Sequence, residues 1–289
     1  MEGTMELLPI EIAYTVPKLD KSADCKAYCI GTDSNKYAVK TTSDNPDYPF
    51  APFDELFCYE LARHCGVAVP QYNLLLDKNG QYAFGSAFEG GVVDNGIIAI
   101  LTEIIKQQIA PEAIDVYIQK LTTIYVLDLF VHNEDRHKDN YLVKDVGGQK
   151  ALMAMDFGRS WTSLNCPIDR TGDFSPTRLP FYYLSPPHPT NNDPSNTWKA
   201  AHFIWSPNCL GGLSGKTLFD TLEKLDNLTP NKLRYILRKS PDEWCSEDRK
   251  LRIIEWWGST SFKERIDAIK LGFTNGNLVS LHSASGLPR

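Results

Sequence analysis

The sequence predicts an α+β protein of two lobes, a small antiparallel β lobe that contains one helix and a larger helical lobe. The first observation is a change of pattern: residues 7–87 are mostly short and extended with turn residues between them, whereas helical periodicity dominates from residue 94 onward. The second is size, because 289 residues, 42% of them hydrophobic, can bury a core in two lobes around a cleft. We place the lobes at residues 1–90 and 91–275, followed by a tail at 276–289.

The small lobe is predicted to consist of two hairpins with one helix between them. We expect strands at residues 26–30, 36–41, 71–76 and 81–86, paired in that order across turn-rich links. Residues 53–65 place apolar side chains at the three- and four-residue spacing of a helix, and Gly66 follows as its natural end.

The larger lobe is predicted to centre on a helix at residues 114–131, which is apolar around most of its circumference. Two later helices are expected to start at capping boxes, Ser240-Pro-Asp-Glu243 and Ser261-Phe-Lys-Glu264. Thr229-Pro230 opens a further helix over residues 231–239, because proline suits the first helical position.

Composition restricts the classes of function. The formal net charge of −6 gives no basic footprint, so we expect neither a direct nucleic-acid partner nor a membrane partner. The seven cysteines are scattered without metal-ligand spacing, and no apolar run reaches the length of a membrane span, so the protein is expected to be cytoplasmic with reduced thiols. Residues 165–213 lack periodicity and are expected to face a substrate or to regulate.

The motif with the most chemical content follows the long helix directly. Asp135 and Asn140 lie five positions apart before a short apolar strand at 141–143, and Asp156 ends the next strand at 152–155. Transfer of a phosphoryl group from a metal nucleotide requires an acid at the attacking hydroxyl and oxygen ligands that hold Mg²⁺ on the phosphates. We therefore expect Asp135 to orient the acceptor hydroxyl or take its proton, and Asn140 and Asp156 to bind Mg²⁺.

Neighbouring residues are further candidates for this chemistry. His137 or Lys138 could stabilise the transferring phosphoryl group and Arg136 could support the loop, although each of these residue types is more often an exposed surface charge. The two strands are expected to pair over a loop at 145–150, which would bring Asp156 to the far side of the metal.

A lysine and a glutamate in the small lobe complete the set. Lys40 ends the second strand and could point into the cleft, with Ala38 as a small floor beneath an adenine ring. Glu55, in the first turn of the helix, is the expected partner of Lys40, because such a pair positions nucleotide phosphates in kinases. Glu60 is the competing carboxylate, about 140° further round the same helix.

A short segment at residues 84–91 joins the extended half to the helical half. Its small residues would let the backbone approach the edge of an adenine ring, so Gly85, Ser86 and Phe88 are candidates for ATP binding. A plain connector between lobes accounts equally well for the same composition.

Taken together, these motifs resemble the HipA-like kinase family, bacterial Ser/Thr protein kinases that often act as toxins in toxin–antitoxin pairs. The resemblance rests on Asp135-Arg-His-x-x-Asn140 and Asp156-Phe-Gly158, preceded by Asp54-Glu-Leu-Phe57 and Phe84-Gly-Ser86, and spans residues 7–271. It implies a two-lobed protein-kinase-like fold that uses ATP and Mg²⁺.

The resemblance also implies roles and partners. Asp135, Asn140, Asp156 and Lys40 would act as assigned above, and the serine that family members autophosphorylate in the nucleotide loop corresponds by position to Ser22. Known members modify proteins such as aminoacyl-tRNA synthetases. The larger toxins carry an extra N-terminal region for which this chain has no room, so we expect that an antitoxin or an accessory N-terminal domain could be a partner.

One departure from kinase patterns concerns the cover over the phosphates. No glycine-rich loop precedes Lys40, so residues 18–25 would have to form that cover. Three alternatives stay open: a lipid kinase of the phosphoinositide type, which shares the Asp-Arg-His-x-x-Asn loop, a small-molecule phosphotransferase, and a nucleotide-binding interaction protein without turnover.

Overall fold

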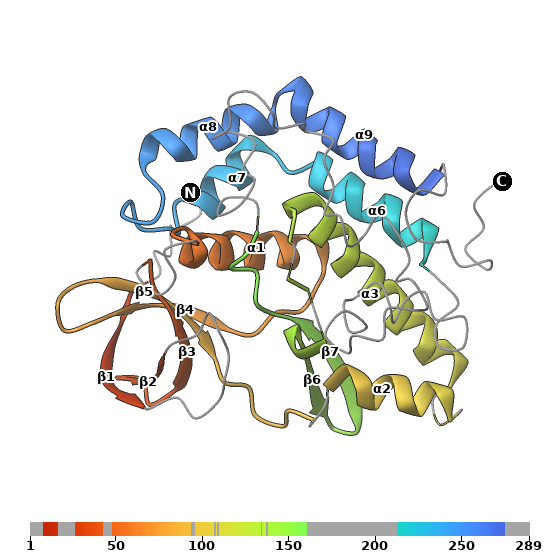
Figure 1. Cartoon of the computed structure of the whole chain (residues 1–289), viewed down its shortest axis with the longest axis horizontal. Coiled ribbons are helices and arrows are strands. Elements are labelled where there is room, and N and C mark those ends of the chain that lie inside the picture. Colours follow the sequence, from red (N-terminus) through yellow and green to blue (C-terminus); the bar gives the residue numbers. More distant parts are fainter. Residues whose placement is uncertain are drawn as a thin grey trace, which may run out of the picture.

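The structure, a computed structural model, describes residues 8–16, 27–42, 48–93, 96–106, 108, 110–133, 135–136, 138–160 and 213–274. Its elements in chain order are β1 (Ile10–Val16), β2 (Ala27–Gly31), β3 (Lys36–Lys40), α1 (Ala51–Cys65), β4 (Tyr72–Leu76), β5 (Tyr82–Ala87), α2 (Gly96–Ile105), α3 (Pro111–Val131), the 3₁₀ turn η1 (Lys138–Asn140), β6 (Tyr141–Val146), β7 (Gln149–Ala154), α6 (Gly215–Asp226), α7 (Pro230–Leu237), α8 (Glu247–Trp257) and α9 (Thr260–Thr274). The strands β1 to β5 gather on one side and most helices on the other, with the β6–β7 hairpin between them (Figure 1).

The small lobe is a closed barrel with strand order β1-β2-β3-β5-β4. The sequence predicts a small antiparallel sheet, and the structure differs because β1 also pairs with β4 in parallel, with Ile10 opposite Leu75. An irregularity between Ile12 and Tyr14 bends β1, and together with the twist that accumulates across five strands it brings the start of β1 back to β4. The interior holds a small apolar cluster: Cys29, Tyr37, Val39, Leu75 and Ala83.

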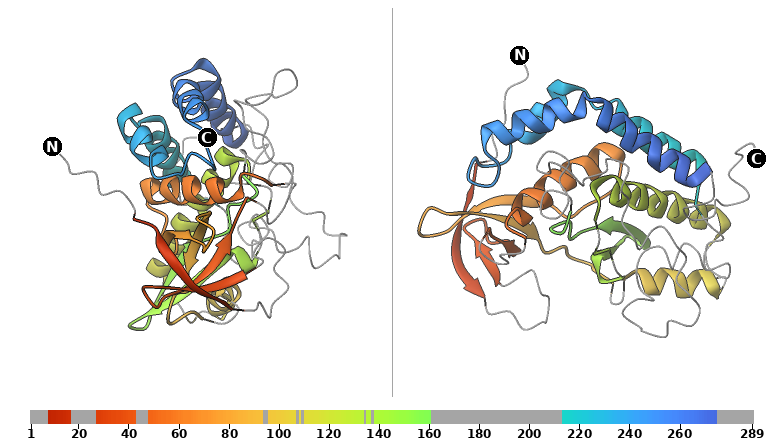
Figure 2. Two further views of the ribbon diagram at one scale, coloured as in Figure 1. Left: turned by 90° about the vertical axis from the view of Figure 1, so that its left-hand side faces the viewer. Right: turned by 45° about the horizontal axis from the view of Figure 1, so that its top comes forward.

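Helix α1 lies between the barrel and the helical lobe. Of its fifteen residues only Arg63 and His64 are not buried, because one side packs on β5 and the other sides pack on α3, α6 and α7. Two views show α1 running beneath the later helices of the chain (Figures 1 and 2). A helix buried on all sides packs against both lobes, and α1 is therefore part of two packing interfaces.

The β6–β7 hairpin is the second structure shared by the lobes. Gly147 and Gly148 form its tip with φ values of 62° and 84°, the left-handed conformation of a two-residue turn, so the loop is shorter than the predicted one at 145–150. On the β6 side, the Val93 N–H donates to the Val143 carbonyl at 2.8 Å. On the β7 side, the Ala154 N–H donates to the carbonyl of Ala68 at 2.9 Å, so backbone of the segment after β5 flanks β6 and backbone of the small lobe flanks β7.

Helix α3 forms the centre of the large lobe, as its apolar pattern predicts. Nearly all side chains of its second half are buried, and α6 and α9 pack against it. The helix over 231–239 is confirmed as α7, where the Thr229 hydroxyl accepts from the Lys232 N–H at 3.3 Å. Among the described residues no helix is both long and apolar enough to cross a bilayer.

The predicted helix start at Ser240 is wrong. The Ser240 N–H already donates to the Leu237 carbonyl at 3.1 Å, so it is not available to the Glu243 carboxylate. Glu243 instead accepts from the Tyr82 N–H of β5 at 2.9 Å, and α8 begins after Ser246, whose hydroxyl accepts from the Arg249 N–H. A carboxylate that a tertiary contact occupies cannot complete a capping box.

The second capping box is displaced by two residues. Helix α9 begins at Thr260, and the Ser259 hydroxyl accepts from the Phe262 N–H at 3.3 Å, so Ser261 lies inside the first turn. The four-residue spacing of the box identified the helix correctly but not its first residue.

Several predictions fall outside the described residues. They concern the segment at 165–213 up to residue 212, the tail from residue 275 onward and the predicted phosphate cover at 18–25. The lobe boundary at residue 90 stays a prediction.

Candidate functional site

A cavity of about 440 Å³ lies between the barrel and the β6–β7 hairpin. Ala38 lines it from β3, Ser86 from β5, and Leu142 and Met155 from the hairpin side. The complete lining is Tyr28, Ala38, Lys40, Glu55, Tyr59, Pro70, Phe84, Ser86, Ala87, Phe88, Glu89, Val92, Leu142, Met155 and Asp156. The cavity is mostly apolar with charged groups at one end, which suits a flat aromatic base attached to an anionic tail.

Two of the three predicted base-binding residues line this cavity and one does not. Ser86 and Phe88 are part of the lining, and Phe88 is half exposed at its edge. Gly85 differs from the expectation because side chains alternate along β5, which directs position 85 into the barrel. A Cβ there would come within 2.5 Å of the Leu75 side chain, so this glycine is needed for packing inside the barrel.

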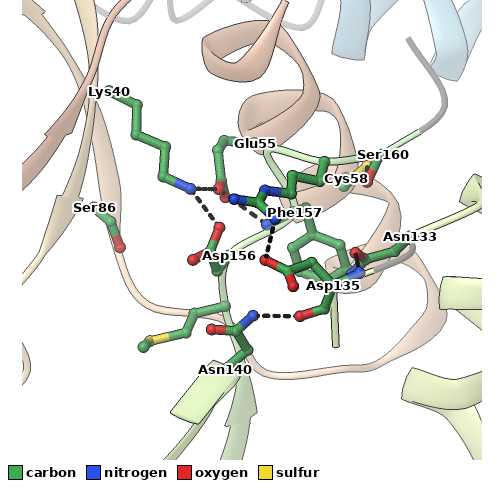
Figure 3. A network of polar contacts seen from close by, with 12 residues as sticks. Lys40, Glu55, Cys58, Ser86, Asn133, Asp135, Asn140, Asp156, Phe157 and Ser160 are labelled. Carbon is green, nitrogen blue, oxygen red and sulfur yellow. Dashed lines mark hydrogen bonds and ion pairs between the residues drawn. The ribbon is translucent and has the colours of Figure 1, made fainter. Parts of the chain in front are cut away.

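The charged end of the cavity is formed by Lys40, Glu55 and Asp156. The Lys40 Nζ donates to Glu55 Oε1 and, at 2.5 Å, to Asp156 Oδ1 (Figure 3). Glu55 Oε1 also accepts from the Phe157 N–H at 2.9 Å, which fixes the strand end that carries Asp156. Gly158 leaves room for this contact, since a Cβ there would lie 3.1 Å from the Lys40 amine.

These three groups set one another's protonation. Burial favours neutral Lys40, but Asp156 and Glu55 outweigh it and raise the pKa of Lys40, which stays charged. Burial also opposes the charge on Asp156, yet Lys40 above all lowers the pKa of this carboxyl to about 2. Burial raises the pKa of Glu55, and Lys40 opposes that shift. Asp156 is therefore ionised at neutral pH, as a ligand of a divalent cation must be.

Asp156 is also held in an unusual backbone conformation. Its φ of 61° lies in the left-handed region, which costs free energy for a residue with a Cβ. Such conformations persist where the surrounding structure imposes them. The contacts of Lys40 with Asp156 and of Glu55 with the next amide are the ones that do so here.

The loop that carries Asp135 is built on polar contacts with the end of α3. The helix ends at His132, whose φ is 54°, and the Asn133 amide donates to Asp128 Oδ1 at 2.9 Å. Asn133 Oδ1 in turn accepts from the Asp135 N–H at 3.1 Å. The Asn140 Nδ2 donates to the Asp135 carbonyl at 2.7 Å, which leaves the Asn140 amide oxygen as the atom available to a cation.

Arg136 joins this loop to both strands of the hairpin. Its guanidinium makes a bidentate contact with Asp128 at 2.9 and 3.0 Å, and both side chains are fully buried. It also donates to the Asn140 carbonyl at 2.8 Å and to the Met155 carbonyl. Because these carbonyls belong to Asn140, which directly precedes β6, and to Met155, which directly precedes Asp156, one guanidinium fixes the distance between the two predicted metal ligands.

Asp128 and Arg159 are charged residues of the site that were not predicted from the sequence. Asp128 lies on the apolar helix α3, seven residues before Asp135, and carries no local motif. Arg159 follows Asp156-Phe-Gly158, and its Nη1 lies 3.4 Å from Asp135 Oδ2 while its guanidinium stacks over the Tyr48 ring at 4.9 Å. Its position after that tripeptide was the one available signal.

Three predicted residues remain without a structural account. Ser22 and His137 lie outside the described residues, and the Lys138 side chain does as well. Of the other predicted residues, Lys40, Glu55 and Asp156 line one end of the cavity. Asp135 and Asn140 are not part of the lining and lie beside Asp156 (Figure 3).

The donor set at this end fits a hard divalent cation. Asp156 offers a carboxylate and Asn140 an amide oxygen, both ligands that Mg²⁺ prefers, and Mg²⁺ usually completes its shell with phosphate oxygens and water. Among the described residues no group of three or more His, Cys, Asp or Glu could hold a metal by itself. Two oxygen ligands with room for a phosphate agree with a cation that enters together with a nucleotide.

Comparison with known proteins gives a fold and no close relative. No protein-family model matches the chain, and no curated protein matches it. The crystal structure of the Helicobacter pylori proinflammatory kinase CtkA is similar, with a TM-score of 0.55 and 17% identity over 91% of this chain and 98% of that one. HipA of Shewanella oneidensis, solved with HipB and operator DNA, gives a TM-score of 0.46 and 12% identity over 94% of this chain and 68% of that one. The chain has a kinase-like fold.

Proposed function

We propose that the protein is an ATP- and Mg²⁺-dependent Ser/Thr protein kinase that transfers the γ-phosphoryl group of ATP to a hydroxyl of a cellular protein. The observation that supports it best is the convergence of Lys40, Glu55 and Asp156 beside Asp135 and Asn140, at the charged end of a cavity of about 440 Å³. Each of these residue types has a role in phosphoryl transfer, and they follow one another along the chain as Lys, Glu, Asp, Asn and Asp, the order found in kinases.

In this proposal the residues divide the work of binding and transfer. Ala38, Ser86 and Phe88 contact the adenine, Lys40 holds the phosphates, and Glu55 holds Lys40. Asn140 and Asp156 are the ligands of Mg²⁺, which when bound neutralises the charge that develops on the phosphates.

Asp135 orients the acceptor hydroxyl in this scheme and accepts its proton. Hydrogen bonds fix its main chain from both sides, with Asn133 at its N–H and Asn140 at its carbonyl, and so orient the residue that carries the carboxylate. Placement of this kind is the main source of rate enhancement in phosphoryl transfer, where little covalent chemistry falls to the protein.

The acceptor and the partners are proposed on the resemblance to HipA-like kinases. We take a cytoplasmic protein, such as a translation factor or an aminoacyl-tRNA synthetase, as the substrate class, and include autophosphorylation at Ser22. An antitoxin, or a partner that supplies an accessory N-terminal domain, belongs to the same proposal, as does growth arrest on expression.

The test is phosphate transfer from radiolabelled ATP with Mg²⁺, with and without a cell lysate. Asp135→Gln and Asp156→Gln are compared with wild type and with Asp267→Asn, an exposed carboxylate of α9 that serves as the matched control. Labelled protein that disappears in the two site variants and persists in the control supports the kinase. Label found in a lipid or a small molecule would overturn the protein acceptor, and binding of ATP without any transfer would favour an interaction protein.

A further inference from the structure

We propose that Glu60 and Lys239 form a positioning device that holds α1 from the helical lobe and so keeps Glu55 on Lys40. The inference rests on the proposed function, in which the Lys40–Glu55 pair positions the nucleotide phosphates. Glu60 is the carboxylate that competes with Glu55 in the sequence, and the structure gives it a different set of partners.

Glu60 is a nearly buried carboxylate, 7% exposed, with partners from three parts of the chain. Its Oε1 accepts from the Tyr72 hydroxyl of β4 at 2.8 Å and from Arg63 of α1 at 3.1 Å. Its Oε2 accepts from the Lys239 Nζ at 2.6 Å, and Lys239 follows α7 in the helical lobe. A charged hydrogen bond with both groups largely removed from water is stronger than a surface ion pair, because solvent screens it less.

The end of α1 is held from the same lobe at a second place. The Lys224 Nζ of α6 donates to the Cys65 carbonyl at 2.9 Å, and the His64 Nε2 lies 2.9 Å from the Lys224 carbonyl. A cation at the carboxyl end of a helix also interacts favourably with the helix dipole. The C-terminal half of α1 is therefore fixed by α6 and α7, whereas its N-terminal half carries Glu55.

The distance between the two halves makes the coupling direct. Glu55 and Glu60 are five residues apart on one helix, a rise of about 7.5 Å along a rigid rod. In protein kinases the position of the corresponding helix decides whether the lysine–glutamate pair forms. In this chain the groups that hold the helix are Lys224 of α6 and Lys239, which follows α7, so folding of the chain itself brings the Lys40–Glu55 pair together.

The test measures how often the buried Lys40 amine becomes accessible, which requires no catalysis. Lys40 is 8% exposed, and its acetylation by an excess of amine reagent can be followed by mass spectrometry at a temperature well below unfolding. The variants are Lys239→Met, Lys239→Arg and Glu60→Gln. Lys232→Met is the matched control, because Lys232 and Lys239 both lie over the Tyr235 ring, at 5.1 and 4.8 Å, and only Lys239 contacts Glu60.

We expect Lys239→Met and Glu60→Gln to raise the rate of Lys40 acetylation about tenfold, the effect of losing one charge-assisted hydrogen bond. The double variant Glu60→Gln/Lys239→Met should show no further increase in the acetylation rate. Lys239→Arg should restore most of the protection of Lys40, and the rate in Lys232→Met should equal that of wild type. Where transfer is measurable, kcat/KM for ATP should fall in the same order.

Two results would overturn the proposal. One is acetylation of Lys40 in Lys239→Met at the wild-type rate. The other is an increase that merely follows the unfolded fraction, measured by circular dichroism on the same samples, because that would mean a loss of general stability. Absence of phosphate transfer in every variant would count against the proposed function alone, since the labelling rates still report whether α1 holds Lys40.

Discussion

At the scale of single residues, Lys40 is shared by two carboxylates. One ammonium group faces both Glu55 and Asp156, so the site carries one negative charge more than it neutralises. An excess of negative charge in a cavity attracts a divalent cation, and the cation in turn would relieve the repulsion between the carboxylates. This excess of negative charge supports the proposal that Mg²⁺ binds here together with ATP.

Arg159 gives the first prediction at this scale. Its guanidinium contacts Asp135 at 3.4 Å but does not line the cavity, so it should affect transfer and not nucleotide binding. We expect Arg159→Gln to lower kcat about fivefold, the magnitude of a partly exposed ion pair, and to leave the Kd for ATP unchanged. The measurement is steady-state transfer together with equilibrium titration of ATP, and an equal loss in both quantities would contradict it.

Local spacing explains which site residues the sequence could predict. Asp135, Asn140 and Asp156 belong to one loop and hairpin, so their separation along the chain fixes their separation in space. Arg159 and Asp128 could not be assigned, because their roles depend on where a side chain points after folding. Gly85 was misplaced for a related reason, since the register of β5 decides which side chains face the cavity.

At the scale of elements, Asp128 and Arg136 connect α3 to the hairpin. We expect Asp128→Asn to lower the free energy of unfolding by about 3–5 kcal/mol, because it leaves a buried guanidinium without its counter-charge. Urea denaturation measures this, and Asp220→Asn is the control, since Asp220 forms an exposed pair with Lys216 whose loss should cost under about 1 kcal/mol. Similar losses of unfolding free energy in the two variants would show that the buried pair stabilises the protein no more than the exposed pair does.

The contacts of Glu60 give a pH dependence at the same scale. Burial raises the pKa of Glu60, but Lys239, Tyr72 and Arg63 outweigh it, so the pKa in the folded protein lies below the ordinary value of 4.5. A carboxyl with a lowered pKa adds stability above its unfolded pKa, and that stability is lost as the pH falls through the folded value.

Wild type should therefore exceed Glu60→Gln in free energy of unfolding by about 1–3 kcal/mol at pH 7. The difference should shrink below about pH 4.5, where protonation begins to remove the same charge from wild type. Urea unfolding from pH 7 down to pH 3 tests this, and a difference that stays constant over that range would refute it.

Helices were predicted more reliably in position than in their first residue. Thr229-Pro230 marked a helix start correctly because the Thr229 hydroxyl accepts from the Lys232 N–H, a contact within four residues of the chain. The predicted start at Ser240 was wrong because the Glu243 carboxylate accepts a hydrogen bond from Tyr82, which is 161 residues away along the chain. Capping patterns describe local donors and acceptors, and they lose their meaning when a tertiary contact takes the acceptor.

At the scale of the whole molecule, the two lobes should unfold together. Helix α1 is buried against both, and backbone of the small lobe at Ala68 flanks β7 of the hairpin. We expect one calorimetric transition with a ratio of calorimetric to van't Hoff enthalpy of about 1. Two resolved transitions would show that the lobes are separate folding units.

The succession of a β-rich part and a helical part was predictable because the pattern of the chain changes once, from extended to helical. Closure of the barrel was not, since it depends on a parallel pair between Ile10 and Leu75, and parallel partners far apart in sequence leave no local trace. The fold of the helical lobe followed from the apolar circumference of α3, whose burial requires that other helices surround it.

The burial of α1 also determines how the chain could be divided. A fragment that ends at residue 93 would keep the barrel but expose the side of α1 that carries Phe53 and Phe57, both fully buried in the whole chain. The remaining fragment would lack the cover over α6 and the strand neighbour of β7. Neither piece would be well folded alone, yet each presents the surface that the other needs. The protein is thus suited to a split reporter, in which two inactive pieces regain function when fused partners bring them together.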